Sequence, residues 1–198
     1  MAKVIHIIGN GDNAHLYQPA KGLKIACNLP PFDISNIFVS CMVDFKMMKA
    51  ITEGSVTNPY PWVLGVRPQK WMEMRQTFYM KYSPQVKEFY TVLPKYAQNY
   101  TDFNCGHFAT HYAANKLKGE EIHLYGFDSI MDFNILSKTD FYLPSDRGAA
   151  NTERLTRTWR PIFAGIFKEF KDTQFVIHHK HNNLPFKKPE NLEIKVHK

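Results

Sequence analysis

Cysteine is scarce in this chain. There are three cysteines among 198 residues, Cys27, Cys41 and Cys105, and no two of them form a Cys-x-x-Cys pair. Three isolated thiols in or beside apolar runs provide neither an even disulfide framework nor a paired-cysteine zinc site. We therefore expect reduced thiols and a reducing compartment, the cytoplasm.

Long hydrophobic runs are also lacking. No stretch approaches the roughly eighteen consecutive apolar residues that a membrane-spanning helix requires. The first apolar run, residues 4–8, is short and leads into a glycine loop rather than a small-residue cleavage site, which argues against a secretory signal. We expect a soluble protein without a membrane partner.

The composition is otherwise that of a globular protein, with 44% hydrophobic and 22% charged residues and no internal repeat. The formal net charge is +7. A basic balance favours anionic partners such as phosphates, nucleotides or nucleic acid, and does not choose among them. A solvated lysine-rich tail is the simpler alternative, because five lysines fall near the end of the chain: Lys180, Lys187, Lys188, Lys195 and Lys198.

Strand-like apolar runs alternate with segments of helical spacing along the chain. This order predicts an α/β fold of Rossmann-like type, a mostly parallel sheet with helices on both faces. Ligands of such sheets bind at the carboxyl ends of the strands, near the point where the strand order reverses. The expected strands are 4–8, 23–27, 37–43, 61–66, 121–126 and 175–177, and the expected helices are 45–51, 104–118 and 154–171.

The domain organisation is predicted as one nucleotide-binding unit, residues 1–185, with a lid-like insertion and a tail. The insertion, residues 67–103, is rich in aromatic residues and is expected to be helical or irregular, packing a small core of its own. Aromatics with positive charge could instead stack single-stranded nucleic acid, but no recognised nucleic-acid module accompanies them. The basic tail, residues 186–198, is expected to be loosely held.

The first candidate site is the glycine loop after the first strand, which contains Asn10, Gly11 and Asp12. Glycines let the backbone approach a phosphate or sugar closely, and an asparagine amide both donates and accepts hydrogen bonds. The loop lacks the third glycine of a dinucleotide fingerprint and the Gly-Lys-Ser/Thr ending of a P-loop. A tight structural turn is the alternative.

Two further candidates follow later in the chain. Asn28 ends the second expected strand, where it could contact the same ligand or simply form a turn before two prolines. Asn104, Cys105 and Gly106 begin a predicted helix, whose free N–H groups and positive dipole end favour an anion. An ordinary helix N-cap would also explain Asn104.

The histidine cluster at residues 178–181 invites a metal interpretation. Adjacent residues of a strand point to opposite faces, so only His179 and His181 could share one ion. No third ligand stands out in the sequence, and we expect no metal site. His179 or Lys180 is predicted instead to contact an anionic ligand.

Three blocks in order, residues 4–13, 26–28 and 104–128, resemble small bacterial sialyltransferases and the related pterin pyrophosphokinase-like proteins. The insertion and the last third of the chain do not align. The resemblance implies a glycosyltransferase that binds a cytidine monophosphate (CMP) sugar and needs no other cofactor. It implies nucleotide contacts from Asn10, Gly11 and Asn28, and a phosphate or sugar cradle from Asn104, Cys105 and Gly106.

Two departures from the family pattern concern the chemistry. The family has Ser or Thr where this chain has Cys105, and its general-base histidine has no counterpart between residues 129 and 158. Asp128, Asp132 or Asp146 could serve as the base, and Tyr142 could steady the departing phosphate. A helix cap, a turn aspartate and a packed aromatic are the corresponding structural alternatives.

The leading hypothesis is therefore a nucleotide-sugar-dependent transferase. One rival is a pyrophosphokinase-like enzyme that uses ATP and Mg²⁺, held by Asp12, Asp44 and Asp128 at three strand ends. Another is a non-catalytic protein that binds nucleic acid or a protein partner. The sequence leaves the donor sugar, the acceptor and the oligomeric state open.

Overall fold

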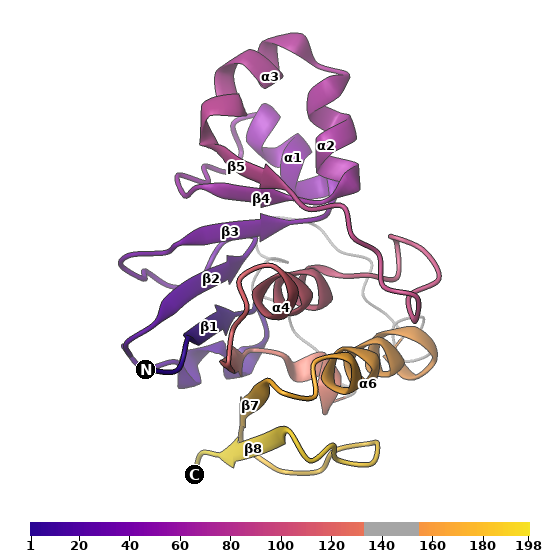
Figure 1. Cartoon of the computed structure of the whole chain (residues 1–198). Coiled ribbons are helices and arrows are strands. Elements are labelled where there is room, and N and C mark those ends of the chain that lie inside the picture. Colours follow the sequence, from indigo (N-terminus) through magenta and orange to yellow (C-terminus); the bar gives the residue numbers. More distant parts are fainter. Residues whose placement is uncertain (133–154) are drawn as a thin grey trace.

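The computed structural model describes residues 1–132 and 155–198 of the chain (Figure 1). Within them, eight strands form one all-parallel sheet in the order β5-β4-β3-β2-β1-β6-β7-β8. This confirms the predicted α/β fold with a parallel sheet. The strands are β1 Val4–Ile8, β2 Leu23–Cys27, β3 Val39–Met42, β4 Trp62–Leu64, β5 Val86–Phe89, β6 Glu121–Tyr125, β7 Gln174–His179 and β8 Leu192–Val196.

Helices cover parts of both faces of the sheet, as predicted. The helices are α1 Phe45–Thr52, α2 Val66–Glu73, α3 Gln76–Tyr82, α4 Cys105–Asn115 and α6 Arg160–Glu169, with shorter turns at η1 Asp12–Leu16, η2 Ser83–Gln85, η3 Asp128–Ile130 and η5 Leu155–Trp159. In β4, Val63 packs into the hydrophobic cluster of α4 and α6, whereas Trp62 and Leu64 pack into that of α1, α2 and α3. Because alternate strand residues point to opposite faces, the two helix groups lie on opposite sides of the sheet (Figure 1). In the described ranges, no helix is both long and apolar enough for a membrane span.

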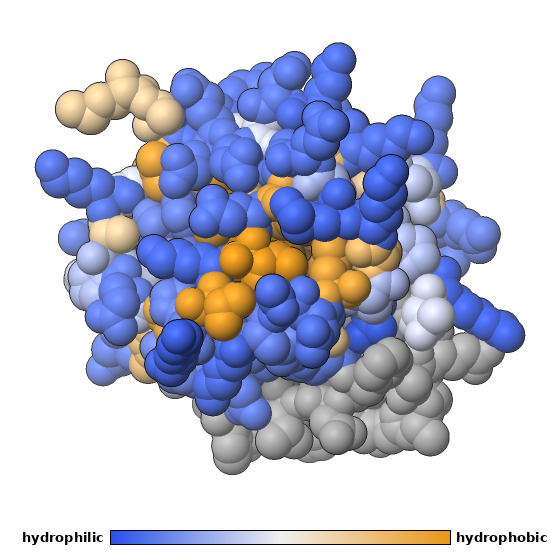
Figure 2. Space-filling view, turned by 90° about the horizontal axis from the view of Figure 1, so that it is seen from below, coloured by the Kyte–Doolittle hydropathy of each residue, from blue (hydrophilic) through white to orange (hydrophobic). Residues whose placement is uncertain are grey.

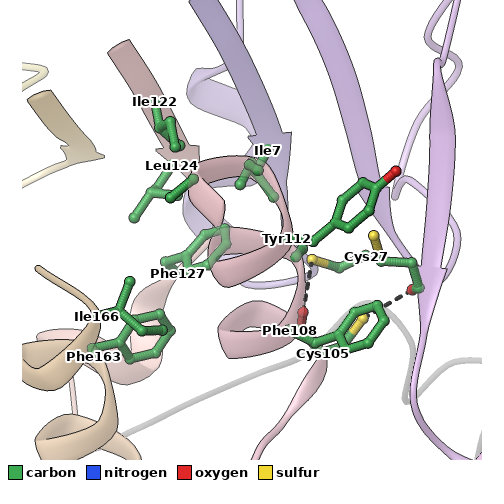
Figure 3. Close-up of a cluster of buried hydrophobic side chains, with 14 of the residues drawn as sticks. Ile7, Cys27, Cys105, Phe108, Tyr112, Ile122, Leu124, Phe127, Phe163 and Ile166 are labelled. Carbon is green, nitrogen blue, oxygen red and sulfur yellow. Dashed lines mark hydrogen bonds between the residues drawn. The ribbon is translucent and has the colours of Figure 1, made fainter. Parts of the chain in front are cut away.

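The main core fills the space between the sheet and helices α4 and α6 (Figure 3). Ile7 and Leu124 reach it from neighbouring central strands, and Phe108 and Phe163 reach it from the two helices. Burying an aliphatic or aromatic side chain of this size contributes roughly 1.5–3 kcal/mol. Helix α4 is apolar on most sides, which fits its position between the sheet and α6.

The segment predicted as a lid, residues 67–103, contributes one strand to the sheet and two helices that pack on it. It is helical in α2 and α3, as expected, but β5 then pairs with β4 as a parallel edge strand. Its aromatic Phe78 is buried with Trp62 of β4, their ring centroids 6.5 Å apart. Of its buried aromatic residues, Phe78 packs in the hydrophobic cluster of α1, α2 and α3, whereas Tyr90 and Phe103 pack in that of α4 and α6.

The prediction of a loosely held tail at 186–198 is wrong for its second half. Residues Leu192–Val196 form β8, which pairs with β7 over five residues, from Phe175↔Leu192 to His179↔Val196. Leu192 is buried because it closes the core beside Phe175, and the partly buried Ile194 packs against the same core. Val196 is exposed. Seen from below, the surface is largely hydrophilic around a central apolar area (Figure 2).

The long helix expected over 154–171 changes its geometry at Arg160. A π-helical turn, η5, leads into α6, which begins at Arg160 with Pro161 in its first turn. A proline is tolerated there because the first N–H groups of a helix have no intrahelical acceptor. Buried Arg160 lies at the start of α6, beside the turn that follows β6.

Candidate functional site

The candidate site lies where the strand order reverses. The chain runs outward from β1 to β5 on one side, then crosses back to place β6 on the other side of β1. Open parallel sheets bind ligands at the carboxyl ends of the strands flanking such a point. We call the carboxyl ends of β1, β2, β6 and β7, with the start of α4, the crest.

The loops after β1 and β6 are joined by backbone hydrogen bonds. Gly9 N–H donates to Tyr125 O at 2.7 Å, and Gly11 N–H donates to Gly126 O at 3.0 Å. A Cβ atom on Gly11 would lie 2.6 Å from Cγ of Asp128. Glycine is therefore required here by the close approach of two loops, whereas the sequence had suggested close approach to a ligand.

The end of β2 joins the same crest and is tied to β3. The side-chain amide of Asn10 donates to Cys27 O at 2.6 Å, and Asn28 N–H donates to Cys41 O at 2.9 Å. The Cys27 thiol lies 3.8 Å from the carbonyl oxygen of Cys105 at the start of α4. The three predicted blocks thus meet at one place, and their roles in ligand binding stay predictions.

Asp128 anchors the turn that follows β1. Its Oδ1 accepts from the Asn13 side chain at 2.9 Å, and its Oδ2 accepts from Asn13 N–H at 3.4 Å. The carboxyl is only 5% exposed, and its pKa is raised by burial against the opposing effect of the two Asn13 bonds. These contacts fit a residue that joins β6 to the first loop, and its predicted catalytic role stays a prediction.

Buried polar atoms without hydrogen-bond partners gather at the crest. Six buried side-chain nitrogen or oxygen atoms lack a hydrogen-bond partner in the described part of the chain, and four of them are at the ends of β1, β2 and β7: Asn10 Oδ1, Asn13 Oδ1, Asn28 Oδ1 and His179 Nδ1. The amide nitrogens of Asn10 and Asn13 donate to protein oxygens, which fixes their oxygens as the unpaired atoms. Leaving such a group unsatisfied costs about 1–3 kcal/mol.

Asn104 is the N-cap of α4, the structural alternative that the sequence allowed. Its Oδ1 accepts from His107 N–H, and His107 Nδ1 accepts from Asn104 N–H, both at 3.0 Å. His107 Nε2 lies 2.9 Å from Trp159 O. Burial lowers the pKa of His107 to about 3, so this reciprocal cap is built on a neutral imidazole.

The side chain of Cys105 belongs to the core and does not contribute to a cradle. Its thiol donates to Cys41 O at 2.9 Å and packs among the apolar side chains of Figure 3. The contact with the Cys27 thiol, reinforced by burial, raises its pKa well above the ordinary value. Gly106 is partly exposed, and a Cβ there would lie 3.1 Å from the Phe127 ring, so helix packing also uses this glycine.

The other predicted site residues differ in how exposed they are and in whether the structure describes them. Asp12 begins η1 and is exposed, and Lys180 is exposed after β7. Tyr142 and Asp146 lie outside the described residues. The position predicted for an anion contact, His179, is buried and faces a carboxylate instead.

Asp132 lies beside His179 and His181, although nothing in the sequence indicated a third group there. His179 Nε2 lies 3.0 Å from Asp132 Oδ2, and His181 Nε2 lies 2.6 Å from Asp132 Oδ1. The two Nε2 atoms are 3.2 Å apart. Buried Arg160 holds the segment by donating to Asp132 O at 2.9 Å and to Ser129 O at 3.2 Å.

A second row of histidines crosses the opposite face of the sheet. The rings of His6 and His123 stack with centroids 4.8 Å apart. His123 Nδ1 lies 2.8 Å from His178 Nε2, and His178 Nδ1 lies 2.8 Å from His197 Nε2. Burial, reinforced by the neighbouring histidines and Lys195, lowers the pKa of His178 to about 3, so the central ring of this row is held neutral.

A cleft of about 770 Å³ lies away from the crest, between the end of α1 and helix α3. Asn58 and Gln85, which precede β4 and β5, form part of its wall, so the cleft is at the amino-end side of the sheet. The Asn58 side chain is used inside the protein, donating to Ser40 Oγ at 2.8 Å. The cleft is not lined by Asn10, Asn13 or Asn28, whose amide oxygens are unpaired.

Comparisons of the chain with protein-family models, with curated proteins and with solved structures found no match. The likeness to sialyltransferases therefore remains a resemblance of three motif blocks.

Proposed function

We propose that the crest binds a nucleotide-activated sugar, a CMP-sugar by resemblance, and that the protein is a glycosyltransferase. The observation that carries the proposal is the set of three buried amide oxygens, on Asn10, Asn13 and Asn28, at the point where the strand order reverses.

The chemistry of these atoms favours the nucleoside part of a ligand. Amide oxygens only accept hydrogen bonds, and a ribose offers two hydroxyl donors while cytosine offers an amino group. A fully ionised phosphate ester offers only acceptors and would not pair with them. The three oxygens therefore suit a ligand that carries sugar hydroxyls or a base amine.

The start of α4 supports a binding position for the phosphate of such a ligand. The helix begins at Cys105, whose carbonyl oxygen lies 3.8 Å from the Cys27 thiol, so it starts beside the Asn28 turn. A helix of this length carries a partial positive charge at its N-terminus, which stabilises anions. That charge would favour the leaving phosphate during transfer.

In the transfer that we propose, an acceptor hydroxyl oxygen forms a bond to the anomeric carbon of the sugar. The bond from that carbon to the phosphate oxygen breaks, the nucleotide keeps the electron pair, and a base takes the acceptor proton. Asp128, Tyr142 and Asp146 stay the predicted catalytic residues. Among them, Asp128 is held by Asn13, which favours a positioning role.

The pyrophosphokinase-like alternative is less well supported. It needs carboxylates near the phosphates and their magnesium ion, for which the sequence offered Asp12, Asp44 and Asp128. Among the residues that the structure describes, these three do not form a ligand group, and Asp44 pairs with Arg67 at 3.2 Å.

A thermal-shift panel of CMP, UMP, GMP, and ATP with and without Mg²⁺ tests the proposal. A ligand at about 100 times its Kd stabilises the native state by about 2.7 kcal/mol, which for a chain of this size is a rise of about 5–10 °C in Tm. We expect this shift with CMP. A shift only with ATP and Mg²⁺ would favour the alternative, and no shift with any nucleotide would refute the site.

A further inference from the structure

Three side chains from two separate segments converge beside the crest. Asp132 follows η3, His179 is the last residue of β7, and His181 comes two residues later. From these we propose that Asp132, His179 and His181 bind one divalent transition-metal ion of the Zn²⁺ type. We call this group the Asp132 cluster.

The spacing of the donor atoms fits one ion. Zinc lies about 2.0–2.2 Å from imidazole nitrogen and carboxylate oxygen, so donors around one ion are roughly 3.0–3.4 Å apart in octahedral or tetrahedral geometry. The two histidine nitrogens are 3.2 Å apart, and one of them lies 3.0 Å from Asp132 Oδ2. The third contact, His181 Nε2 to Asp132 Oδ1, is shorter at 2.6 Å.

Hydrogen bonds alone leave one of these groups unsatisfied. If the two Nε2–H groups donate to the two oxygens of Asp132, His179 Nδ1 is a buried acceptor without a donor in the described part of the chain. A cation between the three groups pairs with the carboxylate charge and leaves the His179 ring proton on Nδ1. At His181 the same change costs the 3.2 Å bond that Nδ1 accepts from Asn183 N–H.

Neighbouring groups are arranged as an outer shell. With a metal on Nε2, the proton of His179 lies on Nδ1, an atom without a hydrogen-bond partner within the described ranges and 4.0 Å from Asp128 Oδ1. Carboxylates commonly orient metal-binding histidines by accepting such a proton. At 4.0 Å, Asp128 is near this position but outside hydrogen-bond distance. Arg160 and the bond from Asp132 N–H to Asp128 O, 2.7 Å long, fix the backbone of the carboxylate ligand.

The exposure of the cluster leaves room for an ion to enter. His179 is 1% exposed, whereas the Asp132 and His181 side chains are 28% and 36% exposed. Two imidazoles and one carboxylate suit zinc and neighbouring transition metals better than Mg²⁺ or Ca²⁺, which prefer oxygen ligands alone. Sequence analysis predicted no metal site because Asp132 is far from the histidines along the chain.

The metal proposal is independent of the nucleotide proposal, and its test uses no nucleotide. The full-length chain without an affinity tag is stripped with a chelator, then titrated with Zn²⁺ by calorimetry and with Co²⁺ by visible absorption. We expect one ion per chain and a cobalt spectrum typical of nitrogen and oxygen ligands.

Three variants locate the site. His181→Gln and Asp132→Asn each remove one ligand from a partly exposed position, and we expect affinity to fall by more than the roughly 10–100-fold typical of an outer-shell change. His197→Gln is the matched control, because His197 is also partly exposed and bonded through Nε2, but to the other histidine row. We expect its zinc affinity to equal that of the wild type.

Either of two results would overturn the proposal. One is a wild-type chain that binds no zinc stoichiometrically. The other is a wild-type affinity that survives in His181→Gln or is lost in His197→Gln, which would place the ion elsewhere. Circular dichroism of each variant separates loss of the site from loss of the fold.

Discussion

His107 makes the stability of the protein depend on pH. The side chain is 0% exposed and uses both ring nitrogens, Nδ1 as acceptor from Asn104 N–H and Nε2 toward Trp159 O. Protonation of Nδ1 would break the reciprocal cap of α4 and bury a charge. The pKa is accordingly lowered from 6.5 to about 3, with burial as the main cause.

The sign and size of the effect follow from linkage. The unfolded chain binds a proton below about pH 6.5 while the folded chain does not, so stability is complete above that pH and falls as the pH drops toward 3. Each pKa unit corresponds to about 1.36 kcal/mol. The loss that His107 causes is therefore about 2 kcal/mol at pH 5, and approaches about 5 kcal/mol near pH 3.

Urea unfolding at pH 7 and pH 5 measures this loss. His107→Gln keeps a side chain that can reach Asn104 N–H in the capping box but does not titrate. We expect the variant to be less stable at pH 7, because the His107 ring packs 4.3 Å from the Phe163 ring centre, yet to lose about 2 kcal/mol less than the wild type between the two pH values. His15→Gln, at an exposed histidine, is the control. Parallel stability curves for wild type and His107→Gln would refute the reasoning.

Two further predictions concern residues that the sequence assigned to the ligand. Cys105→Ala should lower the free energy of unfolding by about 1–2 kcal/mol and leave CMP affinity within about twofold, because its thiol is a core group; urea unfolding and calorimetry check both numbers. A large loss of affinity without loss of stability would contradict this. Gly11→Ala should destabilise the chain by about 1–3 kcal/mol in the same unfolding assay, because its Cβ would lie 2.6 Å from Asp128 Cγ. Wild-type stability would show that the two loops are not closely packed.

The central strands were predictable because their sequences are continuous apolar runs. Residues 4–8 and 23–27 were expected as strands and are β1 and β2 with the same bounds. The meeting of Asn10, Asn28 and the start of α4 followed from the same rule, since parallel strands end on one edge. Local pattern and topology rules therefore supplied the position of the crest.

The edges of the sheet were not predictable in the same way. β8 alternates apolar and polar residues over Leu192–Val196, a strand signal, but the surrounding lysines and prolines made the segment resemble a tail. β5 is four residues long and only Phe89 and Val86 are apolar. Such short strands are stabilised by pairing with a neighbour, which a single sequence does not reveal.

Which side chains contact one another at the crest could not be predicted, because these contacts are set by the tertiary structure. The sequence places Cys105 at a helix start, where its side chain could face a ligand. In the structure the orientation of α4 directs this side chain toward the core. Asp132 joined His179 only because η3 and β7 end side by side. Neither contact has a signature in local spacing.

The central claim is that amide oxygens at the crest bind a nucleotide, and calorimetric titration with CMP of two matched variants tests it most directly. Asn28 and Asn36 both have φ of 60°, so Asn28→Gly and Asn36→Gly each remove an amide from a backbone that glycine adopts freely, but only the first removes a buried acceptor. We predict one CMP per wild-type chain, affinity about tenfold weaker in Asn28→Gly, and affinity unchanged in Asn36→Gly, since one hydrogen bond is worth about 1–3 kcal/mol when its partner is left unpaired. Equal CMP affinity in wild type and Asn28→Gly, or no binding to wild type, would contradict the account.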